Sequence, residues 1–222
     1  MSADDSVQFD DDYEKERFAT PEEVIEAMTV AWQNELCAPC LLPTEMDLVT
    51  TLLDQISGME ESIARQRDRM QLRISLHRME LQRISFITSD YVRCRLQKIE
   101  KNPHAVMEEH NKRKEEGKTA ELLAESEIRF AEEYAQAEAD LFHKTVLEFM
   151  PAALKKISVP RADHQDDMVY AKVLTDNVGN VAIPDWQDLN SEVILEMEKS
   201  SCHLIPWESV RPYVENGSMQ LM

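Results

Sequence analysis

The stretch Leu72–Lys101 reads LRISLHRMELQRISFITSDYVRCRLQKIEK and contains no proline or glycine. It predicts a single helix of about 45 Å, because each helical residue adds about 1.5 Å. At about 100° per residue, its apolar side chains fall on two nearly opposite sides of the helix. The first stripe comprises Leu72, Leu76, Met79, Ile84, Phe86, Ile87, Tyr91 and Cys94, and the second stripe comprises Ile74, Leu81, Val92, Leu96 and Ile99.

A helix that is apolar on two sides needs to be covered on two sides. We expect the first stripe to face the core of this chain. For the second stripe, two alternatives are open: an inner position in the same bundle, or an interface with another subunit. In a chain of only 222 residues, one of these covers can come from another protein.

The same region is basic, although the chain as a whole is acidic. Residues 65–101 contain ten Lys or Arg and four Asp or Glu, in a chain with a net charge of -19. Such a rod can contact nucleic-acid phosphates, or its cations can pair with carboxylates of its own bundle and of a partner. We favour pairing, because so acidic a chain repels DNA over distances near the screening length of about 8 Å and beyond. Direct DNA contact by the isolated chain is therefore disfavoured.

The sequence around this helix divides into four regions. Residues 1–19 form an acidic tail that is expected to be disordered, and its scattered apolar residues permit a second interpretation as a docking motif. Residues 20–150 predict a helical bundle, residues 151–167 a linker, and residues 168–222 a small β-rich domain. The predicted fold class is therefore mainly α, with a small C-terminal domain that is mostly β and that we expect to lean on a neighbour.

Local signals place the elements within these regions. Thr20 and Glu23 form a capping box with Pro21 in the first turn, and Asn102 with Pro103 ends the long helix. Around residues 67–71 a bend and a continuous helix are both open. The expected elements are helices at 20–35, 44–68, 72–101 and 119–150, a loop at 110–118, strands at 168–174, 181–183, 192–195, 203–205 and 219–221, and a helical turn at 207–214.

Residue patterns typical of enzymes do not occur in the sequence. There is no Gly-rich phosphate loop, no nucleophile elbow and no metal-protease histidine pair. Cys37 and Cys40 have the spacing of a redox or half-zinc motif, but no second pair follows, so free thiols are favoured. Cys202 and His203 are expected on opposite faces of a strand. No run approaches about 18 apolar residues. We therefore expect no catalytic residue, cofactor, metal or membrane contact.

Several segments resemble one known family. They are YVRCRLQKIEK (residues 91–101), HRME (77–80), TPEEV (20–24), AWQNE (31–35), SCHLI (201–205) and GSMQLM (217–222). The first two are similar to the long helix of the Sld-five, or fourth, subunits of the eukaryotic GINS complex. The next two resemble the first helix of those subunits, and the last two resemble their final strands. The resemblance extends from about residue 20 to the C-terminus.

This resemblance implies a non-catalytic structural subunit in an obligate heterotetramer with the three other GINS subunits. It also implies a nuclear location, partnership with the MCM motor and its DHH-family partner in the replicative helicase, and links to polymerases. Residues of the long helix would hold the helical core and its interface, and the C-terminal strands would dock on other subunits. The candidate interface or structural residues are Ile74, Leu81, Tyr91, Val92, Arg93, Cys94, Arg95, Leu96, Lys98, Ile99, Leu204 and Leu221.

Two other functions stay open on the residues alone. One is a nucleic-acid-binding helical module that uses residues 65–101, whose affinity for DNA would fall steeply with salt. The other is a free-standing helical adaptor unrelated to replication. Such an adaptor would behave well in solution by itself, whereas a subunit of an obligate complex would not.

Overall fold

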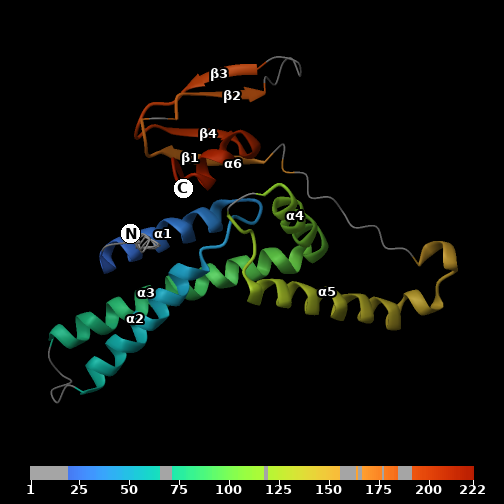
Figure 1. Ribbon diagram of the computed structural model, residues 1–222, viewed down its shortest axis with the longest axis horizontal. Helices are drawn as coiled ribbons and strands as arrows, with labels where there is room; N and C mark the ends of the chain where they lie inside the picture. The colour runs from blue at the N-terminus through green and yellow to red at the C-terminus, as the bar shows by residue number, and fades with distance from the viewer. Residues whose placement is uncertain are drawn as a thin grey trace, which may run out of the picture.

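The computed structural model describes residues 20–65, 72–117, 120–155, 164, 167–176, 178–184 and 192–222. The predicted acidic tail, the predicted connection at 67–71 and most of the predicted linker lie outside the described residues. The elements are α1 (Pro21–Cys37), α2 (Met46–Arg65), α3 (Leu72–Lys101), α4 (Pro103–Glu115), α5 (Glu125–Thr145), η1 (Leu147–Phe149), η2 (Ala152–Leu154), β1 (Met168–Val173), β2 (Asn180–Pro184), β3 (Glu192–Glu196), β4 (Cys202–Pro206), α6 (Trp207–Glu215) and β5 (Met219–Leu221). The predicted class, mainly α with a small C-terminal sheet region, is confirmed (Figure 1).

Helix α1 begins where the sequence predicts. Thr20 Oγ1 accepts a hydrogen bond from the backbone N–H of Glu23 at 3.3 Å, and proline occupies the first helical turn. Met28 of α1 is buried in one cluster with Leu52 of α2 and with Ile87 and Tyr91 of α3. Helix α1 therefore covers the C-terminal half of α3.

Helices α2 and α3 form a long hairpin (Figure 1). Helix α3 has the predicted bounds, because no residue within it interrupts the helical pattern. Towards the tip of the hairpin, Ile63 of α2 packs against Ile74 and Leu81 of α3 in a small buried cluster. Part of the second stripe is thus covered by α2 of the same chain.

Helix α4 corrects the predicted loop at residues 110–118. The side chain of Asn102 caps this helix by accepting from the backbone N–H of Ala105 at 3.2 Å. His110 and Arg113 are buried, and Val106 packs against a cluster that includes residues of α5. These tertiary contacts outweigh the polar local sequence, which by itself is typical of a loop.

The last long helix is shorter than predicted. Helix α5 begins at Glu125 rather than near residue 119, because Leu122 and Leu123 are fully buried as part of the preceding non-helical segment. Ala131 is the last buried residue of α5. Beyond it the helix continues as an arm, and Figure 1 shows its distal end, with η1 and η2, away from every other labelled helix and strand.

The C-terminal part contains a three-stranded antiparallel sheet in the order β4-β1-β5 and a two-stranded ribbon of β2 and β3. Val169 and Ala171 of β1 face a core that also contains Trp207 of α6. Three residues of the α1–α2 connection complete this core: Ala38, Cys40 and Leu42. The sheet region therefore packs on the helical part of its own chain.

Candidate interaction surfaces and a buried charge cluster

A cluster of buried charges lies at the centre of the helical region. The guanidinium of Arg95 is fully buried and forms a two-bond contact with the carboxylate of Glu127, at 2.6 and 2.9 Å. It also donates to Glu35 Oε2 at 3.0 Å and to the backbone carbonyls of Leu42 and Leu122, each at 2.8 Å. All five N–H donors of Arg95 are therefore used.

Lys98 extends this cluster by one helical turn of α3. Its Nζ donates to Glu35 Oε1 at 2.7 Å, to the backbone carbonyl of Glu35 and to the backbone carbonyl of Cys40 at 3.0 Å. The second carboxylate, that of Glu127, also accepts from the backbone N–H of Ala124 at 3.0 Å. Two cations and two carboxylates thus balance each other, as a buried charge cluster requires.

Burial and neighbouring charges shift two pKa values here. Burial alone would lower the pKa of Arg95, but its hydrogen bond with Glu127 and the nearby charges raise it above its usual value. Burial raises the pKa of Tyr91 to about 12. Arg95 therefore stays charged and Tyr91 stays neutral, with the guanidinium lying 5.6 Å from the centre of the Tyr91 ring.

The cluster joins segments of the chain instead of offering reactive groups. Every donor of Arg95 and Lys98 already has an acceptor, so neither is free to bind a substrate. The contacts connect α1, α3 and the start of α5 with the α1–α2 connection. We interpret this cluster as the set of contacts that holds these helices in their relative positions.

The predicted site residues divide by burial. Buried are Ile74, Leu81, Tyr91, Arg95, Ile99 and Leu221; partly buried are Val92, Cys94, Leu96 and Lys98; exposed are Arg93 and Leu204. Ile74, Leu81 and Ile99 thus contact their own chain, because α2 covers the first two and the residues around α4 and α5 cover the third. These three residues lie in the chain's own core, which is one of the two positions left open for the second stripe.

The first stripe was predicted to face the core, but part of it is exposed to solvent. Ile84, Ile87 and Tyr91 are buried as expected, but the N-terminal half of the stripe is exposed. Helix α1 packs on the other half of α3, and its one described ring contact with the exposed residues is that of Trp32 with Phe86, edge to face. We call these residues the hairpin surface: Leu72, Leu76, Met79 and Phe86, which are 56% to 75% exposed.

A second exposed apolar surface lies on the arm formed by α5 and the two turns after it. Leu141 and Phe142 continue the side of α5 that is buried at Glu127 and Ala131, and the other members follow the end of the helix. The sequence showed that the apolar side of the predicted helix is broad, but it did not show which end of the helix stays uncovered. We call these residues the arm surface: Leu141, Phe142, Val146, Phe149 and Leu154, of which Phe149 is 80% exposed.

The described residues contain no group of histidine, cysteine or acidic side chains that could hold a metal. Cys37 is exposed, while Cys40 is buried and its Sγ accepts a hydrogen bond from Trp207 Nε1 at 3.1 Å. Burial raises the pKa of the Cys40 thiol, so it stays protonated and unreactive at neutral pH. Among the described helices, none is long and apolar enough to span a bilayer.

Comparison with known families identifies both parts of the chain. The family model described as the GINS complex protein helical bundle domain matches residues 46–146. The model described as the DNA replication complex GINS protein SLD5 C-terminus matches residues 163–222.

Individual proteins of the same description are similar to this chain over most of their length. The DNA replication complex GINS protein SLD5 of Homo sapiens is 35% identical over 207 residues, which cover 91% of each chain. The protein of that name from Bos taurus is 34% identical over 213 residues, 94% of this chain and 93% of the relative. The one from Arabidopsis thaliana is 30% identical over 213 residues, 89% of this chain and 90% of the relative.

Proposed function

Because the chain belongs to the SLD5 family of GINS complex proteins in DNA replication, we propose that it is a non-catalytic structural subunit of the heterotetrameric GINS complex. In this role it contributes binding energy and geometry, while ATP hydrolysis belongs to the MCM motor of the replicative helicase. The three other GINS subunits, the MCM motor with its DHH-family partner, and polymerase-linking factors are the proposed partners. The proposed location is the nucleus.

The observation that carries this proposal is the arm surface. A water-exposed helix normally hides its apolar side, but residues 139–145 of α5 contain no buried residue. Covering a Leu or Phe side chain stabilises a complex by about 1.5–3 kcal/mol. A partner helix laid along Leu141 and Phe142 would supply the cover that this chain lacks.

The hairpin surface and the exposed Leu204 of β4 support further subunit contacts. They lie on opposite parts of the molecule, as Figure 1 shows for the hairpin and for the C-terminal strands. Exposed apolar residues that gather on one side are a mark of interaction sites in soluble proteins. We propose that they meet different partners of the same assembly.

The ion pairs of α3 support scaffolding over DNA binding. Arg95 and Lys98 are used inside the chain, Arg83 pairs with Glu80, and Arg93 pairs with Asp90 at 2.9 Å. These cations are therefore not available as a continuous row of phosphate contacts. Pairing with carboxylates, which the charge pattern favoured, accounts for them.

The arm surface can be tested by co-expressing the four subunits and measuring recovery of the tetramer. Phe142→Asp and Leu141→Asp place a charge where we propose that a partner packs, and we expect each to reduce recovery by about tenfold or more. His143→Asp adds the same charge to an exposed position on the other side of α5 and should leave recovery unchanged. Normal recovery of both arm variants would contradict the proposed interface.

A further inference from the structure

We propose that the outer edge of β3 is a docking site for an extended, basic peptide segment of a partner protein. Strands β2 and β3 form a two-stranded ribbon, and among the described residues no further strand pairs with β3. Figure 1 shows β3 as the outermost strand of the C-terminal part, with β2 on its other side. This inference goes beyond the proposed function, because the edge lies apart from the arm surface and the hairpin surface.

The pairing within the ribbon shows which backbone groups of β3 point outward. The backbone N–H of Met197 donates to the carbonyl of Gly179 at 3.2 Å, and every second residue before Met197 faces β2 in the same way. In an antiparallel pair, the residues in between direct their N–H and C=O groups away from the partner strand. Glu192, Ile194 and Glu196 therefore present their backbone donors and acceptors along the outer edge.

A third strand would complete a ribbon that is stabilised on one face. Val181, Ile183 and Leu195 pack in the core that also contains residues of α6, whereas Ile194 is 68% exposed and Val193 is 49% exposed. A two-stranded ribbon by itself is marginally stable in water, and a third strand adds both backbone hydrogen bonds and apolar cover. An extended peptide supplies these groups along one of its sides.

The charge of this region indicates the chemistry of the peptide. Residues 173–198 contain six Asp or Glu and no Lys or Arg. Glu196 is exposed and lies on the same face of β3 as Ile194. A cation opposite Glu196 and an apolar side chain opposite Ile194 would complement this face. Exposed ion pairs contribute little affinity, but an acidic surface attracts a basic segment and helps to set its register.

The same charges disfavour two other occupants. Open strand edges pair with copies of themselves unless charged residues prevent it. Two β3 edges brought together in antiparallel register would place glutamate opposite glutamate, and each copy carries a net charge of -19. Nucleic acid is disfavoured because residues 173–198 provide no cation for a phosphate.

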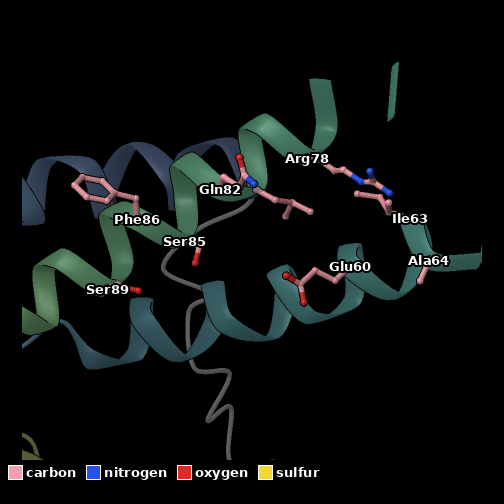
Figure 2. Close-up of a pocket in the computed structure, with 9 residues that line it drawn as sticks. Glu60, Ile63, Ala64, Arg78, Gln82, Ser85, Phe86 and Ser89 are labelled. Carbon is pink, nitrogen blue, oxygen red and sulfur yellow. The ribbon is translucent and has the colours of Figure 1, made fainter. Parts of the chain in front are cut away.

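The groove between α2 and α3, shown in Figure 2, does not offer the chemistry that an extended peptide needs. It encloses about 600 Å³, but its walls are helices whose backbone groups are already bonded within α2 and α3. The N–H and C=O groups of an extended peptide would find no backbone partners there. Strand addition is therefore expected at β3 and not in this groove.

A defined peptide tests the charge complementarity. Strand β3 reads Glu-Val-Ile-Leu-Glu, so the peptide is Lys-Val-Ile-Val-Lys with a threonine at each end and a fluorescent label. Fluorescence anisotropy with the assembled four-subunit complex should show binding about tenfold tighter than that of the same peptide with glutamate in place of lysine. Glu196→Lys should weaken binding of the lysine peptide and strengthen binding of the glutamate peptide. Glu208→Lys makes the same change at an exposed position of α6 and should alter neither.

Backbone substitutions test the strand pairing itself. Ile194→Pro removes an outward N–H and leaves the bonds to β2 in place, so it should weaken binding of the lysine peptide by about tenfold. Ile194→Val keeps this N–H and should stay within about threefold of the wild type. N-methylation along the peptide leaves the protein unchanged, and the loss of binding should recur at every second residue. Hydrogen exchange of the Ile194 and Glu196 amides should slow when the peptide is bound.

Several results would overturn the assignment of this edge. They are equal binding of the lysine and glutamate peptides, N-methylation effects without a period of two, and unchanged hydrogen exchange at Ile194. Self-association of the complex that Ile194→Pro abolishes would also overturn it, because the edge would then belong to a second copy. Failure of the chain to form a tetramer would contradict the proposed function alone, since the same peptides can be tested with the full-length chain by itself.

Discussion

At the centre of the helical region, the guanidinium of Arg95 donates hydrogen bonds from all five of its N–H groups to acceptors of its own chain. Lysine has only three donors and no planar fork, and methionine has none. We expect Arg95→Met to lower the free energy of unfolding by about 3–5 kcal/mol, because Glu127 would stay buried without its partner. Arg95→Lys keeps the charge but loses at least two of the five hydrogen bonds, so we expect it to cause a smaller loss. Urea unfolding followed by circular dichroism measures this loss.

Arg93 provides the matched control. It lies two residues before Arg95 and pairs with Asp90, but its side chain is 59% exposed. Exposed ion pairs contribute about 0–1 kcal/mol, so Arg93→Met should change stability by no more than that. Equal losses for the two arginines would show that burial is not what gives Arg95 its importance.

The sequence predicted that cations of the long helix pair with carboxylates, but not which ones. The partners of Arg95 lie 60 and 32 residues away along the chain, at Glu35 and Glu127. With 43 acidic residues available, neither composition nor helical spacing selects these two. The choice depends on how α1 and α5 pack, which no local pattern records.

At the level of elements, α4 is held against α6 by a ladder of two arginines and two glutamates. Arg211 of α6 contacts Glu109 of α4 and donates to Glu215 at 2.9 Å, and Arg113 of α4 contacts the same Glu215. Burial alone would raise the pKa of the Glu215 carboxyl, but hydrogen bonds from both arginines hold it below its ordinary value of 4.5. The ladder thus depends on ionised Glu215.

This pKa shift determines how the stabilisation provided by the ladder changes with pH. A carboxyl with a lowered pKa stabilises the fold fully above its unfolded value, and the contribution is lost as pH falls through the folded value. The wild type should therefore unfold at a higher temperature than Glu215→Gln at neutral pH, and the difference should shrink below pH 4.5. Glu208→Gln, which removes an exposed carboxylate from the same helix, is the control. A difference that stays constant into acid would contradict this account.

Periodicity predicted the elements that are regular in themselves. The bounds of α3 and β5 are as predicted, and β1 to β4 each differ by one residue at one or both ends. Helix α4 was missed because its sequence is polar and its apolar contacts are few. Its position is fixed by ion pairs with α6 and by packing of Val106 and Met107 against the cluster that includes Ala131 of α5, which the local sequence does not show.

At the level of the whole molecule, the chain covers its surfaces unevenly. The second stripe of α3 is covered within the chain at Ile74, Leu81 and Ile99, whereas the hairpin surface and the arm surface are not. The sequence predicted two apolar sides and too little cover, with the first stripe facing the core and two positions open for the second, but it did not predict that part of the first stripe is exposed. Which stripe is covered depends on where α1, α2 and α5 reach along α3, and the helical pattern is the same in either case.

The cover of the C-terminal domain also depends on how distant segments of the chain pack. Its predicted need for a neighbour is met inside the chain, since Ala38, Cys40 and Leu42 complete its core. Asn34 adds to this by accepting a hydrogen bond from the backbone N–H of Leu221 at 2.8 Å. The domain and the α1–α2 connection therefore share one folding unit, although they are far apart in the sequence.

A fragment of residues 163–222 tests this shared core. Without the α1–α2 connection, Trp207 loses its hydrogen-bond acceptor and part of its apolar cover, so a domain of about this size becomes marginally stable. We expect its amide NMR spectrum to be poorly dispersed, and the same resonances to be well dispersed in the full chain. Leu42→Asp in the full chain should broaden resonances of the C-terminal strands, whereas Leu53→Asp, at an exposed position of α2, should not. A fragment with the dispersed spectrum of the intact chain would show that the sheet folds without the helical region.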